Sequence, residues 1–321
     1  MTVRTAQGDG RELIKNIPDN TIATIYFDPP FNTGKDFTLH KEDDTGFSDA
    51  FDSDADYINL IEPVLIEATR VLKADGSLFF HISAEEMLIP HVLCKKHFSN
   101  VQPIFWQRAR SKNNVKNKLG AVTDIIFWCS NSKKPKYNVV YQPLDEYYST
   151  NSYKNTDWRG NYALGHLVYT KTQRTKRDDR YYAVEVKDRT FEAEHGWRVS
   201  KEDLEKLFAQ DRVHVPATRG NLYRKIYKHE SKGKPATNLW DDIHSIAMGS
   251  EGRKYPTQKP VKLLERIIKM SSDPGDTILD PMAGSGTTGV AAQRLGRSAI
   301  LIDENPDAVE IMASNLKTQE K

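Results

Sequence analysis

Short apolar runs alternate with amphipathic stretches along the first hundred residues. A nearly continuous apolar run over 22–27 is typical of a strand buried on both faces of a parallel sheet, and the run over 77–82 repeats it. Between them, apolar residues at helical spacing predict a helix over 55–73. A shorter strand over 3–7 and a short helix over 11–16 come first. This order of elements predicts a doubly wound parallel sheet.

The middle of the chain has a different pattern. Two strands are predicted within 103–130, on either side of a loop rich in Lys and Asn. Farther on, little periodicity is visible apart from a helix near 200–209, which Ser200 would cap. We therefore predict a first part of the main domain over 1–132, an inserted small domain over 133–238, and the rest of the main domain over 239–321.

The alternation of strand and helix returns near the C-terminus. The sequence predicts a helix over 255–272, with Pro260 tolerated in its first turn, and then a buried strand over 276–280. A glycine-rich turn feeds a helix of small residues. Another strand over 298–303 leads to a closing helix that Asn305 would cap.

Composition places the chain among globular proteins. Its 321 residues are 38% apolar and 28% charged, unlike a disordered chain. The apolar runs are too short to cross a bilayer, and the first ten residues hold no apolar signal segment, so we predict a cytoplasmic protein with no membrane partner. Cys94 and Cys129 lie in apolar surroundings without metal-binding spacing, which predicts buried free thiols and no metal site.

The net charge of +2 is unevenly distributed along the chain. Residues 106–238 hold 27 Lys and Arg against 15 Asp and Glu, whereas the rest holds 19 against 29. A basic middle within an acidic frame indicates contact with a polyanion. A solvated surface rich in Lys would give the same count.

A glycine-rich turn carries the clearest binding motif. Gly284-Ser-Gly-Thr-Thr-Gly289 matches G-x-G-x-x-G, follows a predicted strand and opens a helix. The glycines let the backbone approach a ligand, and the helix N-terminus favours a negative group. Asp303 follows at the end of the next strand, where an acid can bond ribose hydroxyls. Together they predict an adenosine-containing cofactor. No Lys-Ser or Lys-Thr follows the glycines, so the turn is not a P-loop.

Chain length argues against an ordinary NAD or FAD fold. Only 32 residues follow Gly289, whereas a dinucleotide-binding fold needs several more strands after this turn. The missing strands must come before it. We therefore predict an α/β fold with a circularly permuted Rossmann-like sheet, in which 3–7 lies beside 298–303 and 22–27 lies beside 276–280.

The strand over 22–27 ends in Asp28-Pro29-Pro30-Phe31, which the permuted sheet places beside the glycine turn. An exocyclic amine of a nucleobase is a poor nucleophile, because its lone pair is conjugated into the ring. A carboxylate and a rigid carbonyl, each accepting one N–H bond, would draw the nitrogen towards tetrahedral geometry, and proline stiffens that carbonyl. An aromatic ring can stack on an extruded base. Asp28, Pro29 and Phe31 meet these needs in order. A strand-ending turn capped by Asp28 is the plain alternative.

Three motifs carry a family resemblance. Asp28-Pro-Pro-Phe, Pro256-Thr-Gln-Lys-Pro and Asp280-Pro-Met-Ala-Gly-Ser-Gly-Thr-Thr follow one another in this order. They resemble the DNA amino-methyltransferases of the beta motif arrangement, and "DPPFNTGKDF" and "GWRVSKEDLEKL" are similar to type III modification subunits. The resemblance is weakest over 133–238. It implies the S-adenosylmethionine-dependent methyltransferase fold with an inserted target-recognition domain. Tyr255 stands where His is frequent, and the chain is shorter than typical type III subunits.

The resemblance also implies the site and its cofactor. S-adenosylmethionine would be the methyl donor, and Asp28, Pro29, Pro30 and Phe31 would form the catalytic segment. The implied cofactor-binding residues are Asp280, Met282, Gly284 and Gly286 at the methionine portion, Asp303 at the ribose, Asp9 near the adenine, Lys259 near the methionine carboxylate, and Thr287.

The inserted region is rich in tyrosine and in basic residues. Eleven of the fourteen tyrosines lie between Tyr137 and Tyr227, interleaved with basic runs over 171–180 and 219–228. Lys and Arg bind phosphates, whereas Tyr, Asn and Arg can read or stack on bases. Packing of an ordinary small core would also explain the tyrosines. The candidate DNA-contacting residues are Lys112, Lys116, Arg174, Lys176 and Arg177.

The leading hypothesis is sequence-specific methylation of adenine-N6 in duplex DNA through base flipping. Asp at the first tetrapeptide position favours adenine, because cytosine-N4 enzymes of this type often carry Ser there. Cytosine-N4 methylation, a non-catalytic DNA-binding specificity module, and an RNA or protein methyltransferase are the alternatives. A homodimer and a restriction endonuclease are candidate partners by resemblance. No strong base is needed before transfer, so His40 and His81 are expected to be ordinary core or surface residues.

Overall fold

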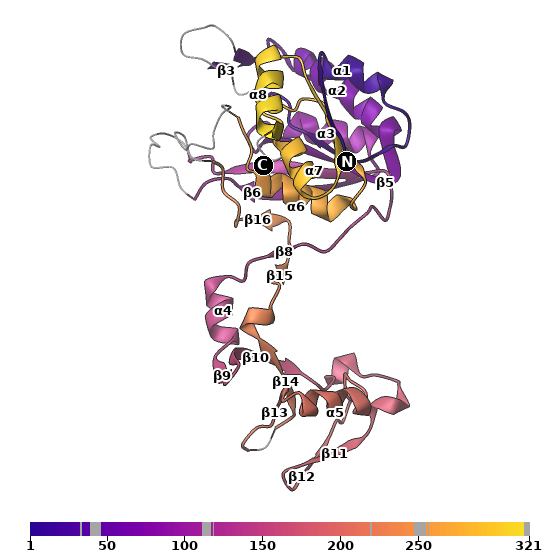
Figure 1. Cartoon of the computed structure of the whole chain (residues 1–321), viewed down its shortest axis with the longest axis vertical. Helices are drawn as coiled ribbons and strands as arrows, with labels where there is room; N and C mark the ends of the chain where they lie inside the picture. The colour runs from indigo at the N-terminus through magenta and orange to yellow at the C-terminus, as the bar shows by residue number, and fades with distance from the viewer. Residues whose placement is uncertain are drawn as a thin grey trace. The chain divides into compact units, whose positions relative to one another are not determined.

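The computed structural model describes residues 1–32, 34–38, 46–110, 117, 119–218, 220–246, 255 and 257–317. The chain forms two compact units (Figure 1), unit 1 over Met1–Val140 with Pro235–Lys321 and unit 2 over Tyr141–Lys234. Residues 133–140 and 235–238, which we assigned to the insertion, belong to unit 1. Their backbone is bonded there, since Asn138 N–H donates to Met270 O and Ala236 N–H donates to Val140 O.

Unit 1 is built on one eight-stranded sheet, and its order is β1-β18-β17-β2-β5-β7-β6-β16. The strands are β1 (Val3–Gln7), β18 (Ser298–Asp303), β17 (Thr277–Asp280), β2 (Ile22–Phe27), β5 (Leu72–Ser83), β7 (Thr123–Ser130), β6 (Asn100–Gln107) and β16 (Leu239–Trp240). Only β7 runs against the others. The predicted neighbours are confirmed: β1 lies beside β18, and β2 lies beside β17.

Helices cover both faces of this sheet (Figure 1). On one face, α1 (Gly10–Leu13), η1 (Ile14–Asn16), α2 (Asp54–Val71) and α3 (Leu88–His97) pack on Ile25 and Phe27 of β2. On the other face, α6 (Val261–Ser271), α7 (Thr287–Arg294) and α8 (Pro306–Lys317) share a core with Tyr26. Successive strand residues thus enter opposite cores, as a doubly wound sheet requires.

Local capping fixes several helix starts. Ser200 accepts from Asp203 N–H at the start of α5 (Lys201–Ala209), as predicted. Asn305 accepts from Asp307 N–H at the start of α8. The helix expected over 255–272 begins only at Val261, because Pro260 has an extended ψ of 134° and stands before the first turn. None of the described helices is long and apolar enough to span a membrane.

Some elements of unit 1 were not predicted. These are α3, the edge strand β16, and a hairpin of β3 (Lys35–Thr38) and β4 (Gly46–Asp49) that follows Phe31. Asn32, with φ of 61°, turns the chain into this hairpin, and Asn32 N–H donates to Asp49 Oδ1. Cys94 and Cys129 are buried and free, as expected.

Unit 2 has its own core. A four-stranded antiparallel sheet has the order β13-β14-β10-β9, and Trp197, Leu204 and Leu222 are fully buried beside it. Its other segments are a β11–β12 hairpin, two α-helices and three short 3-10 helices. The bounds are α4 (Glu146–Ser152), β9 (Asn155–Asp157), β10 (Gly160–His166), η2 (Lys171–Gln173), η3 (Asp178–Arg180), β11 (Ala183–Val186), β12 (Arg189–Glu192), β13 (Val213–His214), β14 (Tyr223–Tyr227) and η4 (Lys228–Glu230), with β8 (Tyr141–Gln142) paired to β15 (Lys234–Pro235) where the unit joins the chain.

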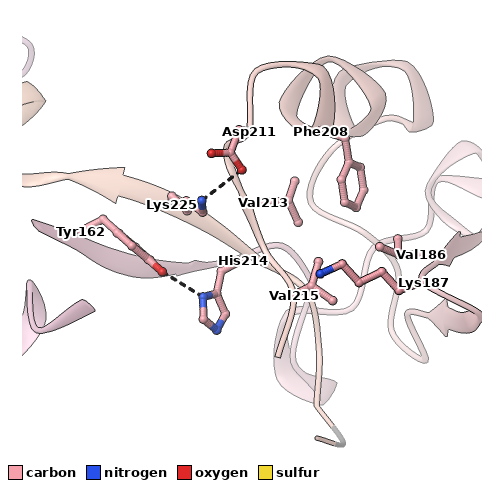
Figure 2. A pocket seen from close by; sticks show the side chains of 9 residues that line it. All are labelled: Tyr162, Val186, Lys187, Phe208, Asp211, Val213, His214, Val215 and Lys225. Atoms are coloured by element: carbon pink, nitrogen blue, oxygen red, sulfur yellow. Dashed lines mark hydrogen bonds and ion pairs between the residues drawn. The ribbon is translucent and has the colours of Figure 1, made fainter. Parts of the chain in front are cut away.

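A pocket of about 370 Å³ lies in unit 2 (Figure 2). Several of its polar groups already have protein partners. Lys225 lies 3.2 Å from Asp211, and the Tyr162 hydroxyl lies 3.1 Å from His214 Nδ1. The pocket holds none of the residues that the sequence predicted for catalysis or cofactor binding. Its lining residues are Tyr162, Val186, Lys187, Phe208, Asp211, Val213, His214, Val215 and Lys225.

Candidate active site

Parallel strand ends bring distant chain segments to one edge of the unit 1 sheet. Thr24 of β2 lies opposite Ile278 of β17, and Ile25 lies opposite Leu279. Asp28 follows β2, and the glycine turn follows β17. Neighbouring parallel strands end at the same edge, where open α/β sheets bind ligands. The predicted catalytic segment and the predicted cofactor turn therefore leave the sheet side by side.

The two carboxylate oxygens of Asp28 have different surroundings. Oδ2 lies 2.6 Å from the ammonium of Lys259. Oδ1 is buried and has no hydrogen-bond partner among the described residues. His81 Nδ1 lies 3.6 Å from Oδ1, beyond normal hydrogen-bond distance. A buried acceptor without a donor is rare in proteins, and at this position it suits a donor that arrives with a ligand.

Phe31 and Lys259 complete the surroundings of Asp28. The Lys259 ammonium lies 5.0 Å from the centre of the Phe31 ring, within the range of a cation–π contact. Pro29 is buried, Pro30 and Phe31 are half-buried, and Phe31 packs against the same core cluster as Met282. The Lys259 ammonium thus contacts both the Phe31 ring and the Asp28 carboxylate, and the ring packs on the same core as Met282 of the glycine turn.

The glycine turn needs its glycines. Gly284 and Gly286 have φ of +50° and +73°, which side chains rarely adopt. A Cβ on Gly286 would lie 2.3 Å from Met312 Cγ, and a Cβ on Gly289 would lie 2.5 Å from Leu301 Cδ1. The first contact sets the turn against α8, and the second lets α7 approach β18. Thr287, at the start of α7, is buried and bonded to Ser285 Oγ at 3.0 Å.

Asp280 stabilises the turn through two hydrogen bonds. Its Oδ1 accepts from Met282 N–H at 3.2 Å, and its Oδ2 accepts from Thr288 Oγ1 at 2.5 Å. Burial is the main cause that raises the pKa of Asp280 to about 8; the Thr288 bond works against it, and the negative charge of Asp28 adds to it. Asp280 is thus a buried residue that fixes the conformation of the turn.

Asp303 connects the next strand to the same turn. Its Oδ2 accepts from Gly284 N–H at 2.7 Å, and its Oδ1 accepts from Asn305 N–H at 3.0 Å. Burial raises the pKa of Asp303, although both backbone bonds lower it. Each carboxylate oxygen can accept more than one hydrogen bond, so both can also accept from ligand hydroxyls.

Asp9 enters the same edge from β1. It caps α1, and its carboxylate is bound by the guanidinium of Arg11, with Nη2 2.7 Å from Oδ2. This pair holds the pKa of Asp9 below its usual value. A Cβ on Gly10 would lie 2.1 Å from Pro281 O, which shows how closely the two turns pack. The Asp9 carboxylate is engaged by Arg11, and its contact with the adenine stays a prediction.

Comparison with known proteins identifies the family. The family model described as "DNA methylase", for N6 and N4 enzymes, matches residues 22–314. The chain belongs to this DNA methylase family. Its members use S-adenosylmethionine as the methyl donor. The matched span includes the tetrapeptide, unit 2 and the glycine turn, which confirms the resemblance found in the sequence.

Several known proteins are similar to this chain. The type II methyltransferase M.EcaI of Enterobacter cloacae is 28% identical, covering 88% of this chain and 61% of its own. The DNA adenine methyltransferase YhdJ of Escherichia coli is 27% identical, covering 95% and 79%. The StyLTI Mod subunit of a Salmonella typhimurium type III restriction-modification enzyme is 25% identical, covering 90% and 49%. The chain thus spans about half to four-fifths of the length of these relatives.

Solved structures confirm the fold. The cytosine-N4-specific PvuII DNA methyltransferase aligns over 98% of this chain and 87% of its own, with a TM-score of 0.55 and 16% identity. TTHA0409 of Thermus thermophilus, solved with S-adenosyl-L-methionine, aligns over 99% of this chain and 96% of its own, with a TM-score of 0.51 and 19% identity. Both support the permuted sheet with an insertion.

The predicted cofactor-binding residues of this chain fit the group that the family uses. A Cβ on Gly284 would lie 3.3 Å from the Tyr255 ring, and one on Gly286 would lie 2.3 Å from Met312 Cγ, so glycines are needed for this close packing of the turn. Asp303 keeps acceptor capacity at the edge of the turn. Lys259 is placed differently from expectation, since its ammonium contacts Asp28 in the structure. Its predicted contact with the methionine carboxylate stays a prediction.

Sequence reasoning gave one group at the site only an ordinary core or surface role. His81 of β5 is fully buried and lies between Asp28 and Asp124. The signal in the sequence was a single His inside an apolar strand, "SLFFHI". That pattern does not say which polar groups the neighbouring strands bring to it.

The structure describes three of the five predicted DNA-contacting residues. Lys112 and Lys116 lie outside the described residues. Arg174, Lys176 and Arg177 are exposed on unit 2, beside η2 and η3. Arg177 is held by Asp179 through two bonds, of 3.0 and 2.9 Å, so Arg174 and Lys176 are the stronger candidates of this run.

Proposed function

We propose that this chain transfers a methyl group from S-adenosylmethionine to the N6 amine of adenine at specific sites in duplex DNA. The observation that carries the proposal is Oδ1 of Asp28 beside the glycine turn, which is buried and has no hydrogen-bond partner within the described ranges of the chain. Asp28 is held by Lys259 through its other oxygen, and the free oxygen is therefore available for a hydrogen bond from an amine.

The chemistry required of the protein is mainly orientation. Asp28 Oδ1 would accept one N–H bond of the target amine, and the carbonyl of Pro29 would accept the other. Both bonds draw the nitrogen lone pair out of conjugation and aim it at the methyl group. Phe31 would stack on the extruded base. Holding two reactants in line accounts for a large part of a transfer rate.

The bound cofactor would supply an electrophilic methyl group on a sulfonium. Gly284 and Gly286 would admit it, and Asp303 would accept from its ribose. Asp280 and Met282 would line the methionine portion with Thr287. Adenine is favoured over cytosine by the Asp at the first tetrapeptide position and by the name of the relative from Escherichia coli, an adenine methyltransferase.

Unit 2 would bind the DNA. Trp158, between β9 and β10, is 77% exposed, and the Arg159 guanidinium lies 4.5 Å from the centre of its ring. Exposed aromatic and guanidinium planes stack on bases, whereas Arg174 and Lys176 suit phosphate contacts. This arrangement favours a target-recognition role for the unit.

Identification of the modified nucleoside tests the proposal. Duplex DNA is incubated with the protein and labelled S-adenosylmethionine, then digested to nucleosides. We expect label in N6-methyladenine. Label only in N4-methylcytosine would move the assignment to the alternative base, and DNA binding without any label would indicate a specificity module. The homodimer, the endonuclease partner and the cytoplasmic location stay predictions.

A further inference from the structure

His81 is a buried polar side chain in direct reach of the proposed catalytic carboxylate. It lies on β5, next to β2 in the sheet, and its side chain has no exposed surface. Its Nδ1 is 3.6 Å from Asp28 Oδ1. The ring is fixed on its flanks by Phe31 and Trp106, at centre-to-centre distances of 5.5 and 5.4 Å. A buried imidazole is costly unless its nitrogens have partners.

Tyr26 determines what His81 Nδ1 does. The Tyr26 hydroxyl lies 2.6 Å from this nitrogen. Burial, followed by the nearby carboxylates, raises the pKa of Tyr26 well above its usual value, so the hydroxyl keeps its proton and can donate it. His81 Nδ1 then accepts, and the ring hydrogen must be on Nε2.

Asp124 favours the same tautomer. His81 Nε2 lies 3.4 Å from Asp124 Oδ2 and Arg108 Nε lies 2.8 Å from Asp124 Oδ1, although neither nitrogen makes a hydrogen bond within the described part of the chain. Burial acts to raise the pKa of Asp124, but His81 and Arg108 outweigh it and the pKa is lowered. Asp124 is thus a carboxylate, which only accepts hydrogen bonds, and it faces the nitrogen that carries the hydrogen.

We propose that His81 is a positioning residue for the transfer: with its ring hydrogen on Nε2 and Nδ1 bound to the Tyr26 hydroxyl, it supports Phe31 and leaves Asp28 Oδ1 free for the target amine. This inference rests on the proposed function. A hydrogen on Nδ1 would instead present an N–H group to Asp28 Oδ1, which would occupy the oxygen that the amine needs.

Polar and charged groups from several elements surround the ring. Tyr26 and Asp28 face it from β2 and the turn after it, and Asp124 faces it from β7. Lys259 and Arg108 lie behind the two carboxylates. A substitution of His81 should therefore change the rate of transfer more than it changes the binding of DNA or cofactor.

Two amide variants of His81 distinguish the role of Nδ1, which faces Tyr26, from that of Nε2, which faces Asp124. In His81→Asn the amide oxygen stands near the place of Nδ1 and can accept from Tyr26, but it cannot be protonated. In His81→Gln the amide reaches towards Asp124 and leaves Tyr26 without its acceptor. His91→Gln is the control, because His91 also stacks on an aromatic ring, that of Phe127, at 5.1 Å.

The rate of transfer is measured together with the DNA KM and the cofactor Kd. We expect His81→Gln to lower kcat by about 10- to 100-fold with KM and Kd unchanged. His81→Asn should keep more activity than His81→Gln, because its amide oxygen can still accept from Tyr26. An unchanged kcat in His81→Gln, or a kcat in His81→Asn no higher than that of His81→Gln, would overturn the proposal.

A structural readout does not depend on activity. Nitrogen NMR of the wild-type protein at neutral pH should show His81 protonated on Nε2 only, with the signal assigned through its shift in Tyr26→Phe. A proton on Nδ1 would refute the inference even if every His81 variant failed to fold. If the wild type transferred no methyl group but showed this tautomer, the proposed function would fail and the tautomer assignment would stand.

Discussion

At the scale of single residues, the site depends on the Asp28 carboxylate, whose two oxygens have different surroundings. Asp28 Oδ2 is bound to Lys259, and both side chains are mostly buried, at 15% and 13% exposed. Removing one partner of such a pair leaves the other charge without compensation. The ammonium therefore fixes Asp28 in place as well as neutralising it.

A double-mutant cycle tests this pair. Lys259→Met should destabilise the wild-type background more than it destabilises Asp28→Asn, because only the wild type keeps a charge at position 28. We expect a coupling of about 0.5–3 kcal/mol between the two changes, measured by chemical denaturation. Additive effects would show that the ion pair does not contribute to stability.

Asp280 makes the stability of unit 1 depend on pH. Burial raises its pKa from an ordinary 3.8 to about 8 in the folded protein. The folded state therefore binds a proton more tightly than the unfolded state, and this group should lower the unfolding free energy as pH rises from about 4 to about 8. The slope is at most about 1.4 kcal/mol per pH unit.

Asp280→Asn removes this titration and keeps an oxygen for Thr288. We expect the variant to gain stability relative to the wild type as pH rises through that window, with the smallest difference near pH 4. Thermal unfolding at several pH values measures the difference. Equal pH slopes for the two proteins would mean that Asp280 does not titrate in the window.

At the scale of elements, the glycine turn joins β17 to α7 in a backbone conformation that is energetically unfavourable for residues with a side chain. Gly286→Ala combines a φ of +73° with a clash against Met312, whereas Gly275→Ala has a φ of +90° and open space. We expect Gly275→Ala to cost about 1–2 kcal/mol of stability and to keep cofactor affinity. Gly286→Ala should cost more and weaken cofactor binding. Calorimetry and thermal melts would measure both, and equal effects would contradict the argument.

The β9–β10 hairpin of unit 2 presents the exposed Trp158. Trp158→Ala should weaken binding to duplex DNA by about 1–3 kcal/mol, the usual effect of losing one base–aromatic stack, and leave cofactor binding unchanged. Tyr147→Ala is the matched control, since Tyr147 is 80% exposed on α4. Fluorescence anisotropy with labelled DNA measures both variants. Equal losses of affinity would argue against a specific role for this hairpin.

Regular elements were predictable from their patterns, and contacts between distant segments were not. The apolar run of β2 and the cap of α5 gave correct elements, because period and capping are local properties. α3 was missed, because Pro90 in its first turn reads as a break in the helical pattern and no side chain caps the helix. The contact of Lys259 with Asp28 joins residues 231 positions apart, and no local pattern encodes such a pair.

At the scale of the whole molecule, the site is assembled from both ends of unit 1. Asp9 and Asp28 come from the first segment, and Lys259, Asp280 and Asp303 come from the last. The permuted order of strands makes this possible, because β1 and β2 flank the β17–β18 pair in the sheet. The insertion of unit 2 between the two segments leaves the order of that sheet intact.

The basic excess in the middle of the chain is shared between the two units. Unit 2 holds 19 Lys and Arg against 14 Asp and Glu, whereas residues 106–140 of unit 1 hold 8 against 1. Several cations of unit 2 are also paired, for example Arg212 with Glu230 and Lys225 with Asp157. The charge pattern therefore indicates that both units contribute to binding a polyanion.

Single-turnover methyl transfer tests the central claim most directly. Wild type and Asp28→Asn are mixed with labelled S-adenosylmethionine and duplex DNA, and cofactor affinity is measured on both proteins. We predict equal cofactor affinity and a transfer rate at least about 100-fold lower in Asp28→Asn. Equal transfer rates in the two proteins would contradict the account.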